Sequence, residues 1–173
     1  PFEGQMSFPA KAVANEFLRL ARENSEALTA MKLQKLVFFA HGWTLALTGN
    51  PLISDPIEAW EFGPVIPALY HEFKRFGNEP ITEPAREGTF RGLKFGTFVP
   101  TLDDYESNSS RSTARQVLSK IWEKYSGFSA ARLSNATHEK GSPWAEVYDP
   151  DKLHIRIPDP LIKKYFEGLI HGK

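Results

Sequence analysis

Apolar residues recur at helical spacing along much of the chain. Residues 8–23 and 30–48 both place apolar side chains at i, i+3, i+4 and i+7, which predicts two α-helices. In the second segment Phe38 and Phe39 widen the apolar face, so we expect this helix to be buried on more than one side. Asp159-Pro160 starts a last helix that runs to Ile170.

Polar residues that commonly cap helix N-termini precede several of these segments. A capping side chain accepts a hydrogen bond from a backbone N–H that the first helical turn leaves without a partner. The expected caps are Ser7, Thr29, Asp103-Asp104, Ser129 and Ser142. The Asp pair would start a helix ending near Tyr125, and the last two serines would start short helices.

Prolines interrupt the helical pattern after residue 50. Ile57–Phe62 alternates apolar and charged residues, which indicates a short strand, and Gly63-Pro64 is expected to turn the chain. Pro67 then opens a third helix, closed by Gly77-Asn78. The Gly- and Pro-rich residues 79–102 are interpreted as an exposed loop or flap, in which 89–93 and 94–99 could pair as strands.

These elements add up to a mainly α fold of six to seven helices with a few short β-strands. The length of 173 residues suits a single compact domain, and a 41% hydrophobic share with 13% aromatics argues against disorder. There is no cysteine, which excludes disulfides, Cys-ligated zinc and thiol chemistry. No apolar run reaches the roughly 20 residues of a spanning helix, so we expect no membrane partner, and the absence of cysteine fits the reducing cytoplasm, where we expect the protein.

The formal net charge is zero, from 21 basic and 21 acidic residues. Nucleic-acid binding is therefore not expected, because it needs net or clustered positive charge. Basic residues that could still form a groove are interspersed with glutamates, which favours solvated helix faces. They are Lys11, Arg19, Arg22, Lys32 and Lys35 in the first two helices, and Lys74, Arg75, Arg86, Arg91 and Lys94 farther along.

The sequence lacks the common catalytic and phosphate-binding motifs. It contains no H-E-x-x-H, no G-x-S-x-G and no glycine-rich phosphate loop, so we assign no catalytic, cofactor-binding or metal-binding residues. One alternative stays open: a small-ligand or metal-binding, hydrolase-like protein that gathers His41, His71 and His138 with Glu61 in one pocket.

An aromatic cluster stands beside the Gly-Pro pair. The run W-E-F-G-P-V at 60–65 places Trp60, Glu61 and Phe62 next to a rigid turn. Two interpretations remain open: the aromatics fold back as a lid on the core, or they anchor a partner protein.

Three blocks, in this order and spacing, resemble a known family. They read K-L-Q-K-L at 32–36, A-W-E-F-G-P-V at 59–65 and T-H-E-K-G-S-P-W at 137–144. The chain resembles the Panacea domain of SocA-like antitoxins, a family that includes phage-associated GepA-like proteins, over about residues 8–170. We assign residues 7–173 to this domain, and residues 1–6 to an expression remnant and the start of the chain.

The resemblance implies a mostly helical, non-enzymatic bacterial protein that neutralises a cognate toxin by direct contact. In the SocA-like branch the antitoxin also acts as an adaptor that delivers its toxin to the ClpXP protease. Many antitoxins carry a helix-turn-helix domain, and the resemblance covers none here, so operon autoregulation is not expected. Partner specificity is expected within 79–112, where the match is weakest. The candidate partner-binding residues are Trp60, Glu61, Phe62, Tyr70, His71, His138 and Trp144.

Overall fold

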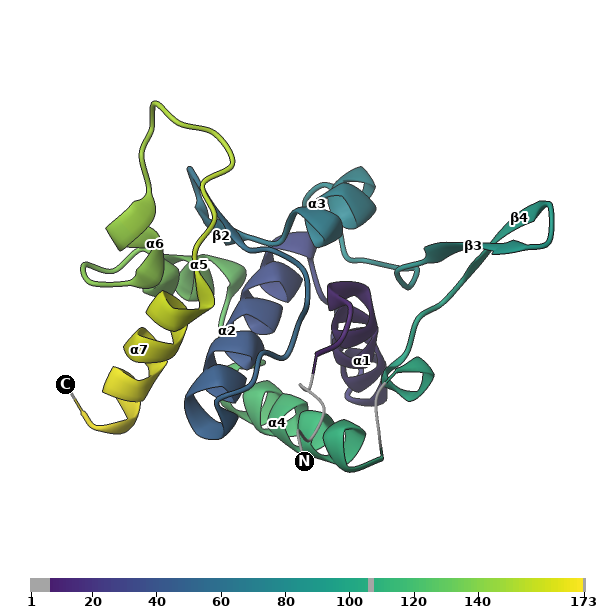
Figure 1. Ribbon diagram of the computed structural model, residues 1–173, viewed down its shortest axis with the longest axis horizontal. Helices are drawn as coiled ribbons and strands as arrows, with labels where there is room; N and C mark the ends of the chain where they lie inside the picture. Colours follow the sequence, from purple (N-terminus) through teal and green to yellow (C-terminus); the bar gives the residue numbers. More distant parts are fainter. Residues whose placement is uncertain (1–6, 106–107, 173) are drawn as a thin grey trace.

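Helix α2 (Ala30–Thr48) lies in the middle of the molecule, and five other helices contact it (Figure 1). It is apolar on almost every side, and twelve of its 19 residues are buried. Such a helix is stable only when neighbours cover all of its faces. The prediction that this segment is buried on more than one side is confirmed.

The computed structural model describes residues 7–105 and 108–172. In these two ranges it has seven α-helices and two two-stranded antiparallel sheets, which confirms the mainly α class. The assignment of residues 1–6 lies outside the described part. The other elements, in chain order, are α1 (Ala10–Glu23), β1 (Glu58–Trp60), β2 (Gly63–Val65), α3 (Pro67–Phe73), η1 (Lys74–Phe76), β3 (Glu87–Arg91), β4 (Lys94–Phe98), η2 (Leu102–Asp104), α4 (Asn108–Tyr125), α5 (Ala130–Thr137), α6 (Pro143–Val147) and α7 (Asp159–Ile170).

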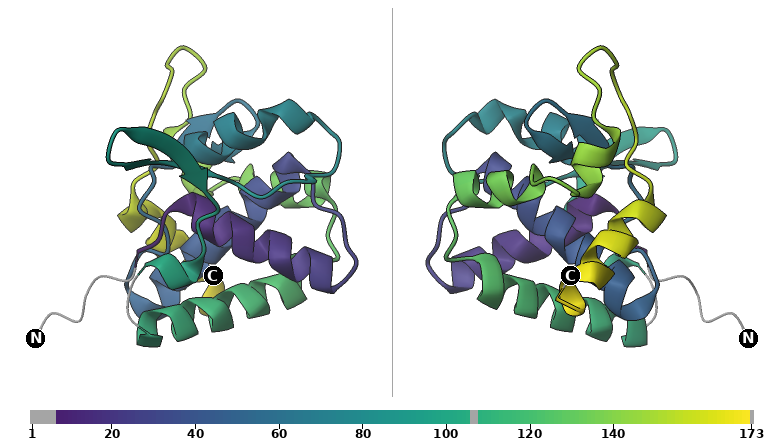
Figure 2. Two further views of the ribbon diagram at one scale, coloured as in Figure 1. Left: turned by 90° about the vertical axis from the view of Figure 1, so that its right-hand side faces the viewer. Right: turned by 90° about the vertical axis from the view of Figure 1, so that its left-hand side faces the viewer.

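The helices around α2 close one continuous apolar core. Helix α4 runs along one edge of the molecule beneath α1 and α2, as the two side views show (Figure 2). Helix α7 packs against α2 at Gly42, where a Cβ atom would lie 2.1 Å from the Phe166 ring. The Phe166 ring also makes edge contacts with Phe38, Phe39 and Trp43. A glycine in mid-helix is therefore what lets α7 approach.

Two predicted caps are wrong. Ser7 does not cap α1: the helix begins at Ala10, and its first N–H donates to the Asp55 carboxylate from a distant loop, over 2.7 Å. Asp103-Asp104 does not start α4 but forms the separate turn η2, closed by a Thr101–Asp104 capping box. Asp55 is distant in sequence from α1, and Asp104 is used within η2. The residues next to each predicted helix start therefore reveal neither arrangement. The caps Thr29, Ser129 and Ser142 are confirmed.

Both sheets are short hairpins. The predicted strand over Ile57–Phe62 is too long, because β1 ends at Trp60 and pairs with Gly63. The turn is therefore Glu61-Phe62, and Gly63-Pro64 belongs to strand β2 rather than to the turn. In the region predicted as a flap, β3 and β4 pair from Glu87↔Phe98 to Arg91↔Lys94 and project from the body (Figure 1).

Candidate partner-binding site

The β1–β2 hairpin is held in place by a buried lysine. Lys35, on α2, is only 3% exposed, and its ammonium donates to the carbonyl oxygens of Phe62 (3.2 Å) and Pro64 (3.0 Å). Burial lowers the pKa of Lys35 to about 8, because the charged form loses hydration. The ammonium thus ties the turn of the hairpin to the central helix.

Gly63 allows the hairpin to lie this close to α2 and α5. Its φ is +109°, in a region that side chains disfavour. A Cβ atom there would lie 2.8 Å from Lys35 Nζ and 2.9 Å from Thr137 Oγ1. The G-P step of the W-E-F-G-P-V block is therefore needed for close approach of the backbone, not for a turn.

A second clamp joins α2 to the start of α3. The side-chain amide of Gln34 donates to the carbonyl oxygen of Ile66 and accepts from its N–H, both over 3.0 Å. Gln34 and Ile66 are both buried, so the pair satisfies two backbone groups that water cannot reach. The K-L-Q-K-L block thus supplies both clamps on the hairpin.

The T-H-E-K-G-S-P-W block supports the hairpin from the other side. Trp144 Nε1 donates to the carbonyl oxygen of Trp60 over 2.6 Å. The Trp144 ring contacts His138, whose Nδ1 lies 2.7 Å from the carbonyl oxygen of Ser134. The three blocks that are far apart in sequence therefore meet around one turn, Glu61-Phe62.

An apolar groove of about 510 Å³ opens beside this turn. The lining comes from α2, both hairpin strands, α3 and the residues after it, and includes Met31, Lys35, Trp60, Glu61, Phe62, Val65, Leu69, Tyr70 and Lys74. Phe62 is 69% exposed and Met31 47% exposed. Large apolar side chains gathered around a concave surface are typical of protein-interaction sites.

The aromatic cluster does not act as a simple core lid. Trp60 is half-buried: its indole N–H donates to Glu58 over 2.7 Å, and its ring meets Tyr70 at 4.9 Å between centroids. Phe62 instead points into solvent from the turn. The Trp60 side chain is therefore held by contacts with the rest of the protein, whereas the Phe62 side chain is exposed and available to a partner.

The candidate residues divide into two groups. Four of them line the groove: Trp60, Glu61, Phe62 and Tyr70. His138 and Trp144 stand behind the hairpin as its support, whereas His71 is exposed on α3, does not line the groove and contacts the Tyr70 ring.

The three histidines of the hydrolase-like alternative have different surroundings. His41 is buried, accepts at Nδ1 from the N–H groups of Leu52 (3.3 Å) and Ile53 (3.2 Å), and lies 2.8 Å from the Asp159 carboxylate. It joins α2 to the following loop and to α7. In residues 7–105 and 108–172, no three His, Asp or Glu side chains are grouped so that they could hold a metal ion.

The lysines and arginines of the first two helices do not form a continuous basic face. Lys11 pairs with Glu72 and Glu87, and Arg19 with Glu16 and Glu23. Lys32 donates to the carbonyl oxygen of Ser126, and Lys35 is buried under the hairpin.

Within the part of the chain that the structure describes, no helix is long and apolar enough to span a bilayer.

Sequence reasoning missed two contributors to the site. Met31 is one of the apolar residues in the helical pattern of 30–48, and Lys35 was interpreted as part of a solvated face, but Met31 lines the groove and Lys35 is buried. One signal was present: Lys35 stands between Leu33 and Leu36-Val37 in an otherwise apolar run, which is an unusual place for a solvated lysine.

Comparisons with known proteins agree on one family. A family model described as "Antitoxin SocA-like, Panacea domain" matches residues 33–145, a range that contains the whole groove except Ala30 and Met31. Antitoxin SocA of Caulobacter vibrioides is 32% identical over 165 residues, covering 92% of this chain and 83% of that protein. No solved structure matches the chain.

Proposed function

Because the chain belongs to the family of SocA-like antitoxins with a Panacea domain, we propose that it neutralises a cognate toxin by direct protein–protein contact at the groove beside Phe62. The contact would take place in the cytoplasm and would involve no chemical step on the antitoxin. The toxin would seat an apolar segment between α2, the β1–β2 hairpin and α3.

One observation carries this proposal: an exposed phenylalanine stands on a turn that buried polar groups hold rigid. Phe62 is 69% exposed, while the carbonyl oxygen of the same residue is bound by Lys35. Exposed aromatic side chains on preorganised backbone lose little conformational entropy on binding, which is why they often dominate binding energy. Burying one such side chain contributes about 1.5–3 kcal/mol.

The matched experiment compares two exposed apolar residues. Phe62→Ser removes the proposed anchor, and Leu153→Ser removes an apolar side chain from a loop outside the groove. We expect the wild type and L153S to bind the product of the adjacent gene in a pull-down and to rescue growth when that product is expressed. F62S should bind at least tenfold more weakly and fail to rescue.

Two outcomes would contradict this proposal. If the wild type neither binds nor rescues against either neighbouring gene product, the antitoxin function fails for those partners. If F62S binds as tightly as the wild type, the groove is not the contact surface. Thermal unfolding of F62S shows whether the fold is retained, which we expect because the side chain is exposed.

Delivery of the toxin to ClpXP is the finer part of this proposal, and the family resemblance alone motivates it. A degradation assay with purified components tests it separately. The adaptor function predicts that ClpXP degrades the toxin only when the antitoxin is present. Unchanged toxin lifetime in the bound complex would leave neutralisation by contact as the whole function.

A further inference from the structure

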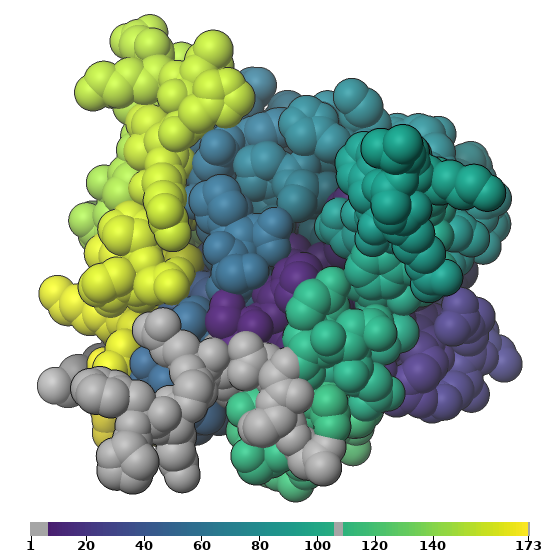
Figure 3. All heavy atoms as spheres, turned by 45° about the vertical axis from the view of Figure 1, so that its right-hand side comes forward, coloured from purple at the N-terminus to yellow at the C-terminus, as the bar shows by residue number. Residues whose placement is uncertain are grey.

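The β3–β4 hairpin projects from the body as an arm (Figure 1), and in the space-filling view it stands in front of the rest of the molecule (Figure 3). We use "the arm" for residues 87–98. Every residue of β4 is exposed, and Phe90 and Phe95 are 72% and 66% exposed. Leu93, in the turn, is fully exposed. A two-stranded sheet has only marginal stability by itself in water. The exposed apolar side chains of the arm add nothing to this stability while they remain in solvent.

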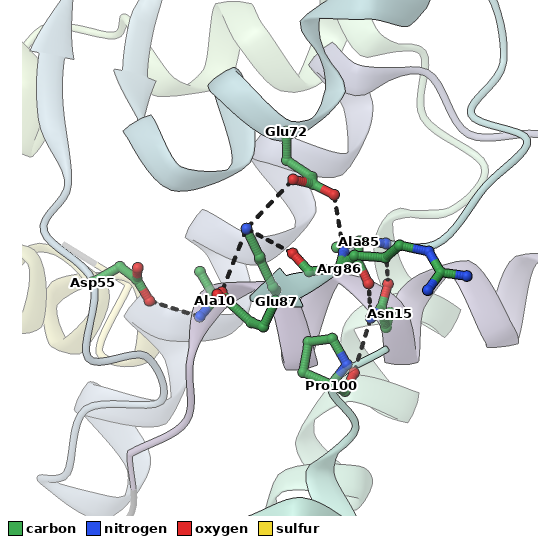
Figure 4. A network of polar contacts seen from close by, with 9 residues as sticks. Ala10, Asn15, Asp55, Glu72, Ala85, Arg86, Glu87 and Pro100 are labelled. Carbon is green, nitrogen blue, oxygen red and sulfur yellow. Dashed lines mark hydrogen bonds and ion pairs between the residues drawn. The ribbon is translucent and has the colours of Figure 1, made fainter. Parts of the chain in front are cut away.

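The root of the arm is nevertheless held firmly (Figure 4). The buried Asn15 side chain on α1 donates to the carbonyl oxygens of Ala85 (3.1 Å) and Pro100 (2.8 Å) and accepts from the Ala85 N–H (2.8 Å). One side chain thus binds the backbone on both sides of the arm. Because buried polar groups are costly unless all their bonds are made, this contact fixes where the arm leaves the body.

Ion pairs and further hydrogen bonds fix the first strand of the arm. The Lys11 ammonium donates to the carbonyl oxygen of Arg86 over 2.8 Å and pairs with Glu72 and Glu87 (Figure 4). Glu72 also accepts from the Arg86 N–H over 2.9 Å. Helices α1 and α3 therefore both hold the arm at its base, while the arm beyond the base is left in solvent.

The two faces of the arm near its tip differ in chemistry. Phe90 and Phe95 are register partners, and their rings meet edge to face at 5.3 Å. Arg91 and Lys94, the next pair toward the turn, occupy the opposite face because side chains alternate along a strand. Among the residues that the structure describes, neither cation forms an ion pair.

Two like charges directly across a strand pair are destabilising, and exposed aromatic rings forgo the free energy of burial. A partner would remove both unfavourable contributions if its apolar surface covered the two rings and its carboxylates paired with the two cations. We propose that the arm is a second docking surface for the toxin partner, which would present an apolar pocket flanked by Asp or Glu side chains. This inference rests on the proposed antitoxin function.

Charge favours such a partner over the other occupants. A second copy of this chain would offer the groove beside Phe62, but two lysines, Lys35 and Lys74, against one carboxylate, Glu61, line that groove, so its charge does not attract a basic arm. A nucleic acid would need more than two cations, and Glu87 stands on the same strand. An acidic apolar protein surface matches both faces of the arm.

The test uses two arm variants and measures affinity for the adjacent-gene product. Arg91→Gln with Lys94→Gln removes the like-charge pair, so the free protein should be as stable as the wild type or more so, yet it should bind at least tenfold more weakly at low salt. Phe90→Thr with Phe95→Thr keeps strand-forming residues and should also weaken binding at least tenfold. Leu153→Ser, on another loop, is the control.

The results distinguish a failure of the arm inference from a failure of the proposed antitoxin function. If the wild type binds the toxin and both arm variants bind equally well, the arm inference is overturned while the proposed function stands. If the wild type does not bind, both fail. Two further results would overturn the inference: arm variants that change only self-association in sedimentation, or only binding to anionic phospholipid vesicles.

Discussion

The ammonium of Lys35 lies 3.0 Å from the carbonyl oxygen of Pro64, beneath a hairpin and shielded from water. A charged group in this place loses its hydration and receives two carbonyl dipoles instead. No carboxylate in residues 7–105 or 108–172 pairs with it. The hairpin that carries Phe62 is thus anchored by a cation that the fold itself does not neutralise.

Stability should rise with pH in one alkaline window because of Lys35. Its pKa falls from 10.5 to about 8 on folding, so between these values the unfolded chain binds more protons than the folded one. The free energy of unfolding should therefore increase from pH 8 to 10.5, by up to about 3 kcal/mol. Chemical denaturation of the wild type and Lys35→Met at pH 7 and pH 10 isolates this gain, with Lys120→Met as an exposed control. Equal pH dependence in all three proteins would contradict it.

Gly63→Ala should destabilise the protein by at least about 2 kcal/mol. The added Cβ would meet Lys35 Nζ and Thr137 Oγ1 below 3.0 Å, in a backbone conformation that side chains disfavour. Gly127→Ala is the matched control, because open space surrounds a Cβ there. Thermal melts of both variants compare the two positions. A melt of G63A that matches that of G127A would show that the hairpin can move away from α2 at little cost.

The Asp159–His41 contact should stabilise the fold at neutral pH and weaken in acid. The hydrogen bond from His41 lowers the pKa of Asp159 below its ordinary value of 3.8. The contribution of the contact is therefore complete above pH 3.8 and is lost as the pH falls through the folded pKa. Asp159→Asn should be less stable than the wild type at pH 6, and the difference should shrink below pH 3.8. Asp151→Asn, at an exposed position, should show no such trend in denaturation at each pH.

Asn15→Ala should loosen the arm. The substitution leaves the Ala85 N–H and the Pro100 carbonyl without their buried partner, at a cost of about 1–3 kcal/mol per group. Hydrogen exchange should therefore speed up over residues 85–100 more than in α2. Asn24→Ala, at an exposed helix end, is the control. Exchange that rises equally throughout the chain would mean that Asn15 holds the whole fold rather than the arm.

Sequence patterns predicted the helices well because a period of 3.6 residues persists over many turns. The segment 30–48 and the caps Thr29 and Ser129 were predicted as the structure shows them. The β1–β2 turn was misplaced by two residues, because Gly63 was interpreted as a turn residue when its role is to avoid Lys35. A close approach between segments far apart in sequence leaves no local signature.

The candidate site was predicted only in part, because contacts between segments far apart in sequence also determine which of its residues are exposed. Trp60 and Phe62 stood out as aromatics beside a turn, but nothing local separated the supported ring from the exposed one. Met31 and Lys35 lie one helical turn apart; the apolar pattern does not show that Met31 lines the groove, and Lys35 was interpreted as solvated although it is buried. Their surroundings are set by α3 and by the hairpin, which no helical period describes.

The central position of α2 also has a consequence during synthesis on the ribosome. The side of α2 that α7 covers stays bare until α7, which lies more than a hundred residues farther along the chain, has been made. At a translation rate of about 5–20 residues per second, this interval lasts roughly 5–20 s. From the time α2 leaves the ribosome until α7 docks on Gly42, the nascent chain therefore exposes one apolar side of its central helix, and exposed apolar surface of this kind is what chaperones bind.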